Sequence, residues 1–428
     1  MTALTAQGST REGADFGFRS FVFIASLLLA WISTAPFKGD GAENYASSNV
    51  LNQLFFTGLA IAGMGALCRI DGKLVRSYWR ASWALMFVWI LFSVFRSDDF
   101  AVSLRAFLFL VTVTIIAGAS VLMPTGRAHF AWMIALVALV LLGLNYLGLL
   151  VWPDLAMHTA ADRNEAQHAG SWRGSFDHKS IAGSMMGVLF FVGIFVFRAG
   201  LRLRGIAITA LALVFLLSTR SKTGIGLAPV VLGLSLACSW VESSRLRTML
   251  ALGPFALMVT FTLGSVLLPP VDHILQALSP GQTYTGRTEI WGFALDRLAQ
   301  RPIVGFGLET FWASDAVKYA EIGENETGIS SGMPHGHNSF LDAAVHFGIV
   351  GLLLVAVVLV IAPIRDYNRA RQFPENRLIA DLMLQIWLFT IYSANLESFF
   401  FRRADPVWFA LLFAVIYLRF LSRYRTAP

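Results

Sequence analysis

Long apolar runs recur along almost the whole chain, and they limit its fold more than any other feature. Twelve candidate segments fall at 20–36, 48–68, 82–95, 100–123, 129–152, 180–197, 205–218, 223–241, 249–269, 338–363, 380–397 and 406–422. A helix needs roughly 20 apolar residues to cross a bilayer, because backbone amides cannot be left unpaired in lipid. With 56% hydrophobic and 14% charged residues and a mean hydropathy of +0.64, the chain is predicted to be all-α, a polytopic membrane helix bundle of about twelve transmembrane helices.

The number of spans has a lower and an upper limit. Segments 82–95 and 205–218 are short enough for a buried or re-entrant helix, so ten to twelve spans, in an even number, are expected. Arg11 and Arg19 precede the first run, as basic residues do in a cleaved signal peptide, but the eleven further runs favour an uncleaved first helix. Residues 1–428 are therefore treated as a single membrane domain.

Basic residues are distributed unevenly between the two predicted sides. If the N-terminus lies in the cytoplasm, the inner segments carry 19 Lys and Arg against 7 Asp and Glu, although they are much shorter in total than the outer ones. This bias follows the positive-inside rule and places both termini in the cytoplasm. The net charge of +7 is thus read as an orientation signal, and no nucleic-acid partner is expected.

Two connections on the predicted outer side are long, 153–179 and 270–337. The second is a large extracytoplasmic loop between the ninth and tenth predicted spans. Within it, the stretch TGRTEIWGFALDRLAQRP repeats apolar residues at helical spacing from Ile290 to Leu298. We expect a short helix there, lying on the membrane surface and ended by Pro302 and the glycines that follow it.

Ionisable residues in or beside the spans lie almost entirely at predicted outer ends. They are Arg105, Lys179, Arg220, Lys222, Asp342, His346 and Glu397. An ion-coupled transporter normally holds its proton or sodium site near the middle of the membrane, where this chain has almost no charge. The distribution therefore favours binding or chemistry at the outer interface.

The stretch GMPHGHNSFLDAAVHFG leads into the tenth predicted span. Either Asn338 or Ser339 can cap this helix, since Ser339 and Asp342 have S-x-x-D spacing. His337 then lies just before the first turn. Asp342 and His346 are four residues apart on one helix face, so a hydrogen bond between them is expected to be within reach.

Three histidines in this stretch raise the question of a metal. A zinc site from His335, His337 and His346 is disfavoured, because no cysteine supports it and nearby basic residues oppose a cation. No metal or other cofactor is expected. An interfacial histidine without a role stays the competing explanation for His337, and it is the favoured one for His335 and His346.

Basic residues at outer span ends suggest an anionic ligand. Arg220 and Lys222 are packed into the tight turn Ser218–Thr223, and Arg287 follows Thr285-Gly286 at the start of the predicted surface helix. Several cations near a helix N-terminus favour a phosphate or diphosphate group. The alternative is that each arginine is a snorkelling anchor at the membrane surface.

Several of these stretches together resemble the O-antigen ligase and Wzy-type polysaccharide polymerase superfamily, most closely its exopolysaccharide polymerase branch. The motifs that carry the resemblance are TGRTEIW at 285–291, RPIVGFG at 301–307, His337-Asn338, FGIVG at 347–351, the stretch 97–105 ending in Ser-Leu-Arg, and Ser218-Thr-Arg220. One departure is His178-Lys179-Ser180, where the family often has asparagine after the lysine.

The resemblance implies a function and roles for individual residues. His337 would be the catalytic base, while Arg220 and Arg287 would hold the diphosphate of the donor. Arg105, Lys179, Lys222 and Asn338 are expected to contact the substrate. The implied reaction is a metal-independent, inverting glycosyl transfer at the periplasmic face of a bacterial inner membrane.

The expected donor is an oligosaccharide linked to undecaprenyl diphosphate, and the acceptor is a glycan hydroxyl. Membrane lipid and other polysaccharide export and chain-length proteins are the further partners considered. Polymerisation of exopolysaccharide or O-antigen repeat units is preferred over ligation to lipid A core or to protein. Three other classes compete: a metal-dependent transferase using Asp98 and Asp99, a flippase or transporter of lipid-linked oligosaccharide, and a binding scaffold.

Overall fold

The computed structural model describes residues 10–32, 36–37, 50–76, 80–162, 166–284, 286–319 and 335–427. Within these residues the chain is helical and forms no β-strand, apart from one isolated bridge between Met157 and Trp172. An all-α membrane protein satisfies its backbone amides inside each helix, which is the arrangement that lipid requires.

The first half of the chain forms α1 (Thr10–Ile32), α2 (Val50–Leu67), α3 (Gly72–Arg76), α4 (Ala81–Phe95), α5 (Phe100–Leu122), α6 (Arg127–Val151), α7 (Pro153–Ala156), η1 (Ala166–His168), α8 (Lys179–Arg198) and α9 (Arg202–Ser218). The second half forms α10 (Lys222–Trp240), α11 (Ser244–Phe261), α12 (Leu263–Leu267), α13 (Pro269–Leu278), α14 (Arg287–Leu298), α15 (Asp315–Lys318), α16 (Ser339–Ala356), η2 (Val357–Ile361), α17 (Ala362–Ala370), η3 (Pro374–Asn376), α18 (Arg377–Ser393) and α19 (Pro406–Leu421).

Each of the twelve predicted apolar segments carries a helix. The segment 249–269 is divided into α11 and α12, and 338–363 continues from α16 through η2 into α17. Among the described residues, seven helices are long and apolar enough to cross a membrane, in α1, α2, α5, α6, α8, α10 and the continuous stretch Ser339–Ala370. The polytopic membrane fold is thus confirmed, whereas the total of twelve spans stays a prediction.

Helices α18 and α19 form the centre of the bundle. Every residue of α18 from Ile379 to Ser393 is buried, and so is α19 from Pro406 to Arg419. A helix that is apolar all round belongs inside a protein or a membrane. In contrast, α2 and α9 expose large apolar side chains such as Leu54 and Leu203, as helices that face lipid do.

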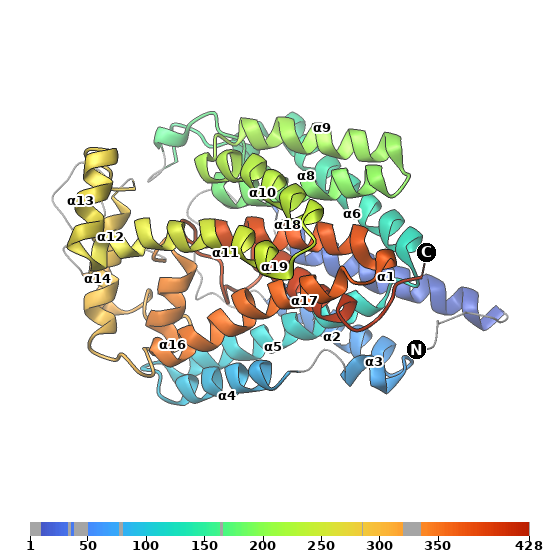
Figure 1. Ribbon diagram of the computed structural model, residues 1–428, viewed down its shortest axis with the longest axis horizontal. Coiled ribbons are helices and arrows are strands. Elements are labelled where there is room, and N and C mark those ends of the chain that lie inside the picture. The colour runs from blue at the N-terminus through green and yellow to red at the C-terminus, as the bar shows by residue number, and fades with distance from the viewer. Residues whose placement is uncertain are drawn as a thin grey trace.

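The helices run mostly along one direction, and α12, α13 and α14 lie across it at one end of the bundle (Figure 1, left). The N-terminal end of α1 and the C-terminus lie toward the opposite end (Figure 1, right). Helix α14 confirms the short helix expected within 285–302. The predicted loop 270–337 holds more helix than was expected, because α13 and α15 also lie in it.

Helix α14 is anchored by its apolar face. Trp291 is fully buried in a cluster with Phe311 and Leu341, and its indole nitrogen donates to the Gly336 carbonyl at 2.9 Å. This contact links α14 to the residue before His337. The TGRTEIW stretch and the first turn of α16 are more than forty residues apart in the sequence. They nevertheless share one small apolar core.

Helix α16 bends at Gly348, where φ is 69° and ψ is −176°. The bend frees backbone carbonyls that the helix would otherwise use, and neighbouring segments satisfy them. The amides of Phe306 and Gly307 donate to Val345 and His346, both at 2.9 Å. The RPIVGFG loop thus holds the first half of α16 in place through these two backbone hydrogen bonds.

Candidate functional site

His337 lies at the entrance to α16, in the connection that positions the candidate site. Its φ of 51° is in the left-handed region, which is uncommon for a non-glycine residue. The next residue, Asn338, caps α16: its side-chain oxygen accepts from the amides of Phe340 and Leu341, both at 3.0 Å. Of the two capping residues considered from sequence, Asn338 is the one used.

The start of α16 is held against the connection between α18 and α19. The Asn338 amide donates to Ser398 Oγ at 3.0 Å, and its side-chain nitrogen donates to the Asn395 carbonyl at 3.0 Å. The Ser339 hydroxyl donates to the Glu397 carbonyl at 2.8 Å. These bonds fix His337 next to Glu397.

Glu397 is the point where the candidate residues meet. Its Oε2 lies 3.9 Å from His337 Nδ1, and its Oε1 lies 3.4 Å from Arg287 Nη2. Thr223 Oγ1, in the first turn of α10, donates to the same Oε1 at 3.4 Å. Arg287 also donates to the Leu396 carbonyl. One carboxylate therefore joins residues from α10, α14 and the start of α16.

The charges around Glu397 keep it ionised. Burial by itself would raise the pKa of this carboxyl group, but the Arg287 guanidinium and then His337 outweigh burial and lower the pKa to about 2. Burial acts in the opposite sense on the neighbouring His335 and, with the nearby His337 and Arg402, holds the pKa of the His335 imidazole well below its usual value. At neutral pH the site thus contains a carboxylate beside an uncharged His335.

His337 is close to this carboxylate without being hydrogen-bonded to it. A separation of 3.9 Å exceeds the length of a hydrogen bond, and His337 Nδ1 is buried with no hydrogen-bond partner among the described residues. About a third of the side chain is exposed, 33%. An imidazole with one face open and a carboxylate behind it has the arrangement of a general base with an orienting acid.

Arg220 lies in the turn between α9 and α10 and does not reach this carboxylate. Its φ is 51°, and its guanidinium donates to the Ala169 carbonyl at 3.5 Å. The same turn continues into Thr223, which does bind Glu397. Lys222 is exposed as the first residue of α10. The structure therefore brings the turn to the site but leaves both cations outside the contacts with His337 and Arg287.

Lys179 and Arg105 differ in their relation to the site. Lys179 is the first residue of α8, and its amide donates to His158 Nε2 at 3.2 Å. The preceding residue, His178, is close enough to act electrostatically on both Glu397 and His335. Arg105 is exposed on α5 and forms no hydrogen bond or ion pair within the described part of the chain.

The two aspartates considered for a metal have other partners. Asp99 caps α5 by accepting from the Val102 amide at 3.0 Å, and Asp98 pairs with Arg301 at 2.9 Å. Among the described residues, no group of three or more His, Cys, Asp or Glu side chains is placed to hold a metal ion. His335, His337 and His346 are therefore not assembled as zinc ligands.

The prediction that Asp342 and His346 form a hydrogen bond is wrong. Asp342 Oδ1 instead accepts from Trp312 Nε1 and from the Gly336 amide, both at 3.0 Å. Both ring nitrogens of His346 are buried and find no hydrogen-bond partner within the described segments. The Asp342 carboxylate turns toward Trp312 and Gly336 because these two residues each donate a hydrogen bond to it. His346, on the same helix, would offer only one donor.

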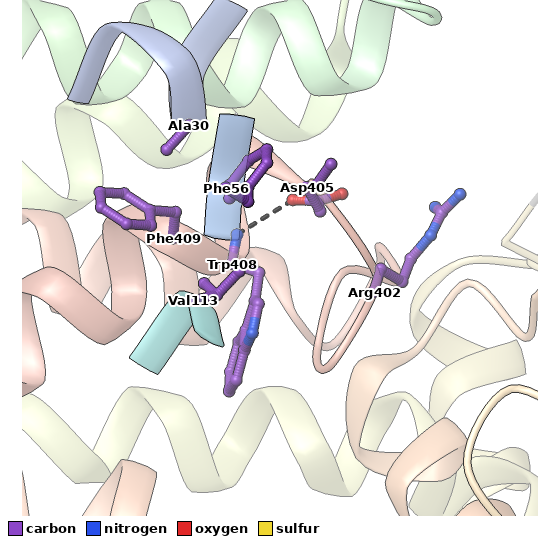
Figure 2. A pocket seen from close by; sticks show the side chains of 8 residues that line it. Ala30, Phe56, Val113, Arg402, Asp405, Trp408 and Phe409 are labelled. Carbon is purple, nitrogen blue, oxygen red and sulfur yellow. Dashed lines mark hydrogen bonds between the residues drawn. The ribbon is translucent and has the colours of Figure 1, made fainter. Parts of the chain in front are cut away.

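A small cavity with no room for a water molecule lies under the connection between α18 and α19. Figure 2 shows Ala30, Phe56 and Phe409 around it, with Asp405 bonded to the Trp408 amide and Arg402 turned away from the apolar side chains. The cavity does not include His337, Arg287 or Glu397. The Arg402 guanidinium nevertheless donates to the Ser398 carbonyl at 3.1 Å, so it borders the same connection.

Sequence reasoning assigned no role to Glu397 or Thr223. Glu397 was noticed only as a charge at an outer span end, and no motif marks it. The one available signal was that Glu397, like Asp342, is an acid among outer span-end residues that are otherwise basic or histidine. Its 110-residue separation from Arg287 hides the contact from any local pattern.

Comparison with known proteins finds a family match for the segment that holds most of these residues. Residues 207–356 match the O-antigen ligase family. This segment includes Arg220, Arg287 and His337. The chain is also 30% identical over 155 residues to the exopolysaccharide production protein ExoQ of Rhizobium meliloti (strain 1021), an alignment that covers 36% of this chain and 35% of the relative. The chain thus spans about a third of the length of the curated relative that it matches.

Proposed function

We propose that this chain, which carries a domain of the O-antigen ligase family, is a membrane glycosyltransferase that moves a lipid diphosphate-linked oligosaccharide onto an acceptor hydroxyl. The observation that carries the proposal is the convergence of His337 and Arg287 on the Glu397 carboxylate. A base and an anion-binding guanidinium on one buried acid are the two groups that this reaction requires.

His337 acts as the general base in this proposal. It takes the proton of the acceptor hydroxyl while that oxygen bonds to the anomeric carbon of the donor. The bond from this carbon to the diphosphate breaks in the same step, so the configuration inverts. Glu397 holds the imidazole and stabilises the imidazolium that forms. Asn338, which is fully buried, acts by positioning His337.

Arg287 receives the charge that develops on the leaving lipid diphosphate. Its 3.4 Å contact with Glu397 is a long ion pair, which leaves guanidinium N–H groups available for phosphate oxygens. Arg220 is proposed to bind the same diphosphate from the α9–α10 turn. Lys222, Lys179 and Arg105 are proposed as further contacts of the donor.

The preferred substrate is an undecaprenyl diphosphate-linked repeat unit, which the enzyme would polymerise at the periplasmic face of a bacterial inner membrane. The name of the matched relative, an exopolysaccharide production protein, favours this reading. The name of the matched family favours ligation of finished polymer to another acceptor, which is the second candidate. Export and chain-length proteins are proposed partners in either case.

The proposal is tested in a strain that lacks the gene and is complemented with variants. His337→Ala should abolish polymer while the protein still accumulates in the membrane, because the acceptor proton then has no base. His273→Ala is the matched control, since His273 is exposed on α13 in the same loop. Near-normal polymer from His337→Ala would refute the base assignment. Mass analysis of the lipid-linked intermediates separates the candidates: single repeats indicate a polymerase, and full-length lipid-linked polymer indicates a ligase.

A second prediction concerns the anion-binding arginines. Arg287→Ala and Arg220→Ala should each lower kcat/KM by roughly 10²–10³-fold, as the loss of one oxyanion-stabilising donor does. Arg287→Lys and Arg220→Lys should restore only part of this, because the planar fork of donors is lost. Turnover of a lipid diphosphate-linked donor by purified protein measures the effect. Full activity of both lysine variants would show that a point charge suffices.

A further inference from the structure

Arginines gather at the end of the bundle opposite to His337. Arg80 precedes α4, Arg369 lies in α17, Arg419 lies in the last turn of α19, and Arg423 follows that helix. Arg80, Arg369 and Arg423 all act electrostatically on Arg419, together with a single acid, Asp366. Four positive charges and one negative charge leave this arginine cluster with a surplus of positive charge.

Arg419 is buried, which makes the surplus costly. Its side chain is 7% exposed, its Nη1 lies 3.7 Å from Asp366 Oδ1, and its Nε has no hydrogen-bond partner in the part of the chain that the structure describes. Arg80 contacts the same Asp366 oxygen, and the Asp366 side chain is only 2% exposed. A buried guanidinium normally has its donors satisfied, because an uncompensated buried charge is strongly destabilising.

Two other arginines at this end, the buried Arg247 and the largely buried Arg371, provide an internal comparison. Arg371 donates to Asp381 at 2.6 Å and to the Ser239 carbonyl at 2.8 Å. Arg247 donates to the Val241 carbonyl at 2.9 Å and to Asn368 Oδ1 at 3.0 Å. Their donors are used within the protein, whereas among the described residues Arg419 Nε has no acceptor and three further cations lie near it. The arginine cluster therefore carries more positive charge than its one acid, Asp366, balances.

We propose that the arginine cluster binds a phosphate group. Guanidinium groups donate pairs of hydrogen bonds to phosphate oxygens, and basic pockets between helices at the cytoplasmic side of membranes take lipid head groups. The phosphate comes either from an anionic phospholipid or from a free phosphate ligand. Arg419 lies in the last turn of α19, and the first turn of that helix is ~24 Å away. The arginine cluster is therefore a different site from the one at His337. Its binding of phosphate does not depend on the proposed reaction.

The test uses the purified full chain and the double variant Arg369→Gln with Arg423→Gln. Both residues are exposed, so the variant removes cluster charge without disturbing the buried Arg419–Asp366 contact. Arg204→Gln is the matched control, because Arg204 is an exposed arginine at the same end of the bundle. Thermal unfolding is measured with phosphatidylglycerol, with an uncharged glycolipid of the same acyl chains, and with inorganic phosphate against chloride at equal ionic strength. Native mass spectrometry counts retained lipid.

A lipid head group is indicated if phosphatidylglycerol, but neither the glycolipid nor inorganic phosphate, stabilises the wild type and the Arg204→Gln control. A free phosphate ligand is indicated if inorganic phosphate stabilises them as well. In either case the double variant should bind more weakly by about fivefold for each arginine removed. Equal stabilisation of the wild type and the double variant, or no difference between phosphate-bearing additives and their controls, overturns the proposal.

Discussion

At the scale of single residues, Glu397 decides what the candidate site can do. His337 and Arg287 lie on separate segments of the chain. Among the described residues, Glu397 is the group that lies close to both of them. With it, the imidazole gains an acid behind its Nδ1, and the guanidinium is drawn to within ion-pair distance of the same group. The polarity of the site thus depends on one residue outside the segment that matches the family.

Replacing Glu397 should separate the effect of its negative charge from the effect of its shape. Glu397→Gln keeps the shape but removes the charge, so we expect roughly 10²-fold or greater loss of turnover, within the range for removing acid–base assistance. Glu397→Asp should retain more activity because the charge remains. Asp296→Asn, at an exposed acid of α14, is the control. If Glu397→Gln turned over donor like the wild type, the orienting role would be excluded.

The pH dependence of stability follows from the same group. The pKa of Glu397 falls from 4.5 to about 2 on folding, so its contribution to stability is complete above about pH 4.5 and is lost as the pH falls through 2. The wild type should therefore lose unfolding temperature relative to Glu397→Gln as the pH falls from about 4.5 toward 2. A difference in unfolding temperature that stays the same over this acid range would contradict the lowered pKa.

At the scale of elements, the bend in α16 explains why two glycine-containing motifs occur together. A Cβ at Gly348 would lie 2.0 Å from the Ile303 carbonyl oxygen, and one at Gly305 would lie 2.5 Å from the Val345 carbonyl oxygen. The Trp89 indole and the Ser93 hydroxyl donate to the Phe347 and His346 carbonyls, both at 2.9 Å. The bend therefore depends on close backbone contact between the RPIVGFG loop, α4 and α16.

Substitution at the bend should affect stability more than an ordinary helix glycine does. Gly348→Ala combines a positive φ with a steric clash, so we expect a loss of about 3 kcal/mol or more in the free energy of unfolding. Gly143→Ala in α6, where an added Cβ meets no atom within 4 Å, should be neutral or slightly stabilising. Thermal unfolding in detergent compares the two. Similar stability of both variants would show that the bend is not required.

At the scale of the whole molecule, the two ends of the bundle carry different chemistry. One end holds α14, His337 and the Glu397 carboxylate, while the other holds the N-terminal end of α1, the end of α19 and the arginine cluster. The predicted orientation places the first end in the periplasm. This predicted orientation rests on the excess of basic residues in the inner segments. It does not rest on any contact within the fold.

Cysteine labelling tests this orientation. With the exposed Cys68 replaced by alanine, Gln300→Cys after α14 should react with a membrane-impermeant maleimide in cells whose outer membrane has been permeabilised. Glu242→Cys, exposed between α10 and α11, should react only after the inner membrane is opened. The opposite pattern would reverse the predicted topology and place the site in the cytoplasm.

The sequence by itself determined which segments are helices and where the ionisable residues lie along them. Both are local properties: apolar length and helical period are written in neighbouring residues, and lipid leaves the backbone no other way to satisfy its amides. It also singled out His337 and Arg287 as candidates, because each stands in a recognisable short motif.

Only the tertiary structure decided which of these residues meet. Glu397 contacts Arg287 across 110 positions of sequence, Asp342 binds Trp312 rather than His346, and Arg220 turns toward Ala169. These choices depend on the packing of α18 against its neighbours and on which donors lie nearest to each acceptor in space. Neither hydropathy nor motif spacing contains that information, because hydrogen bonds and ion pairs are decided by distances between helix ends that the chain brings together only on folding.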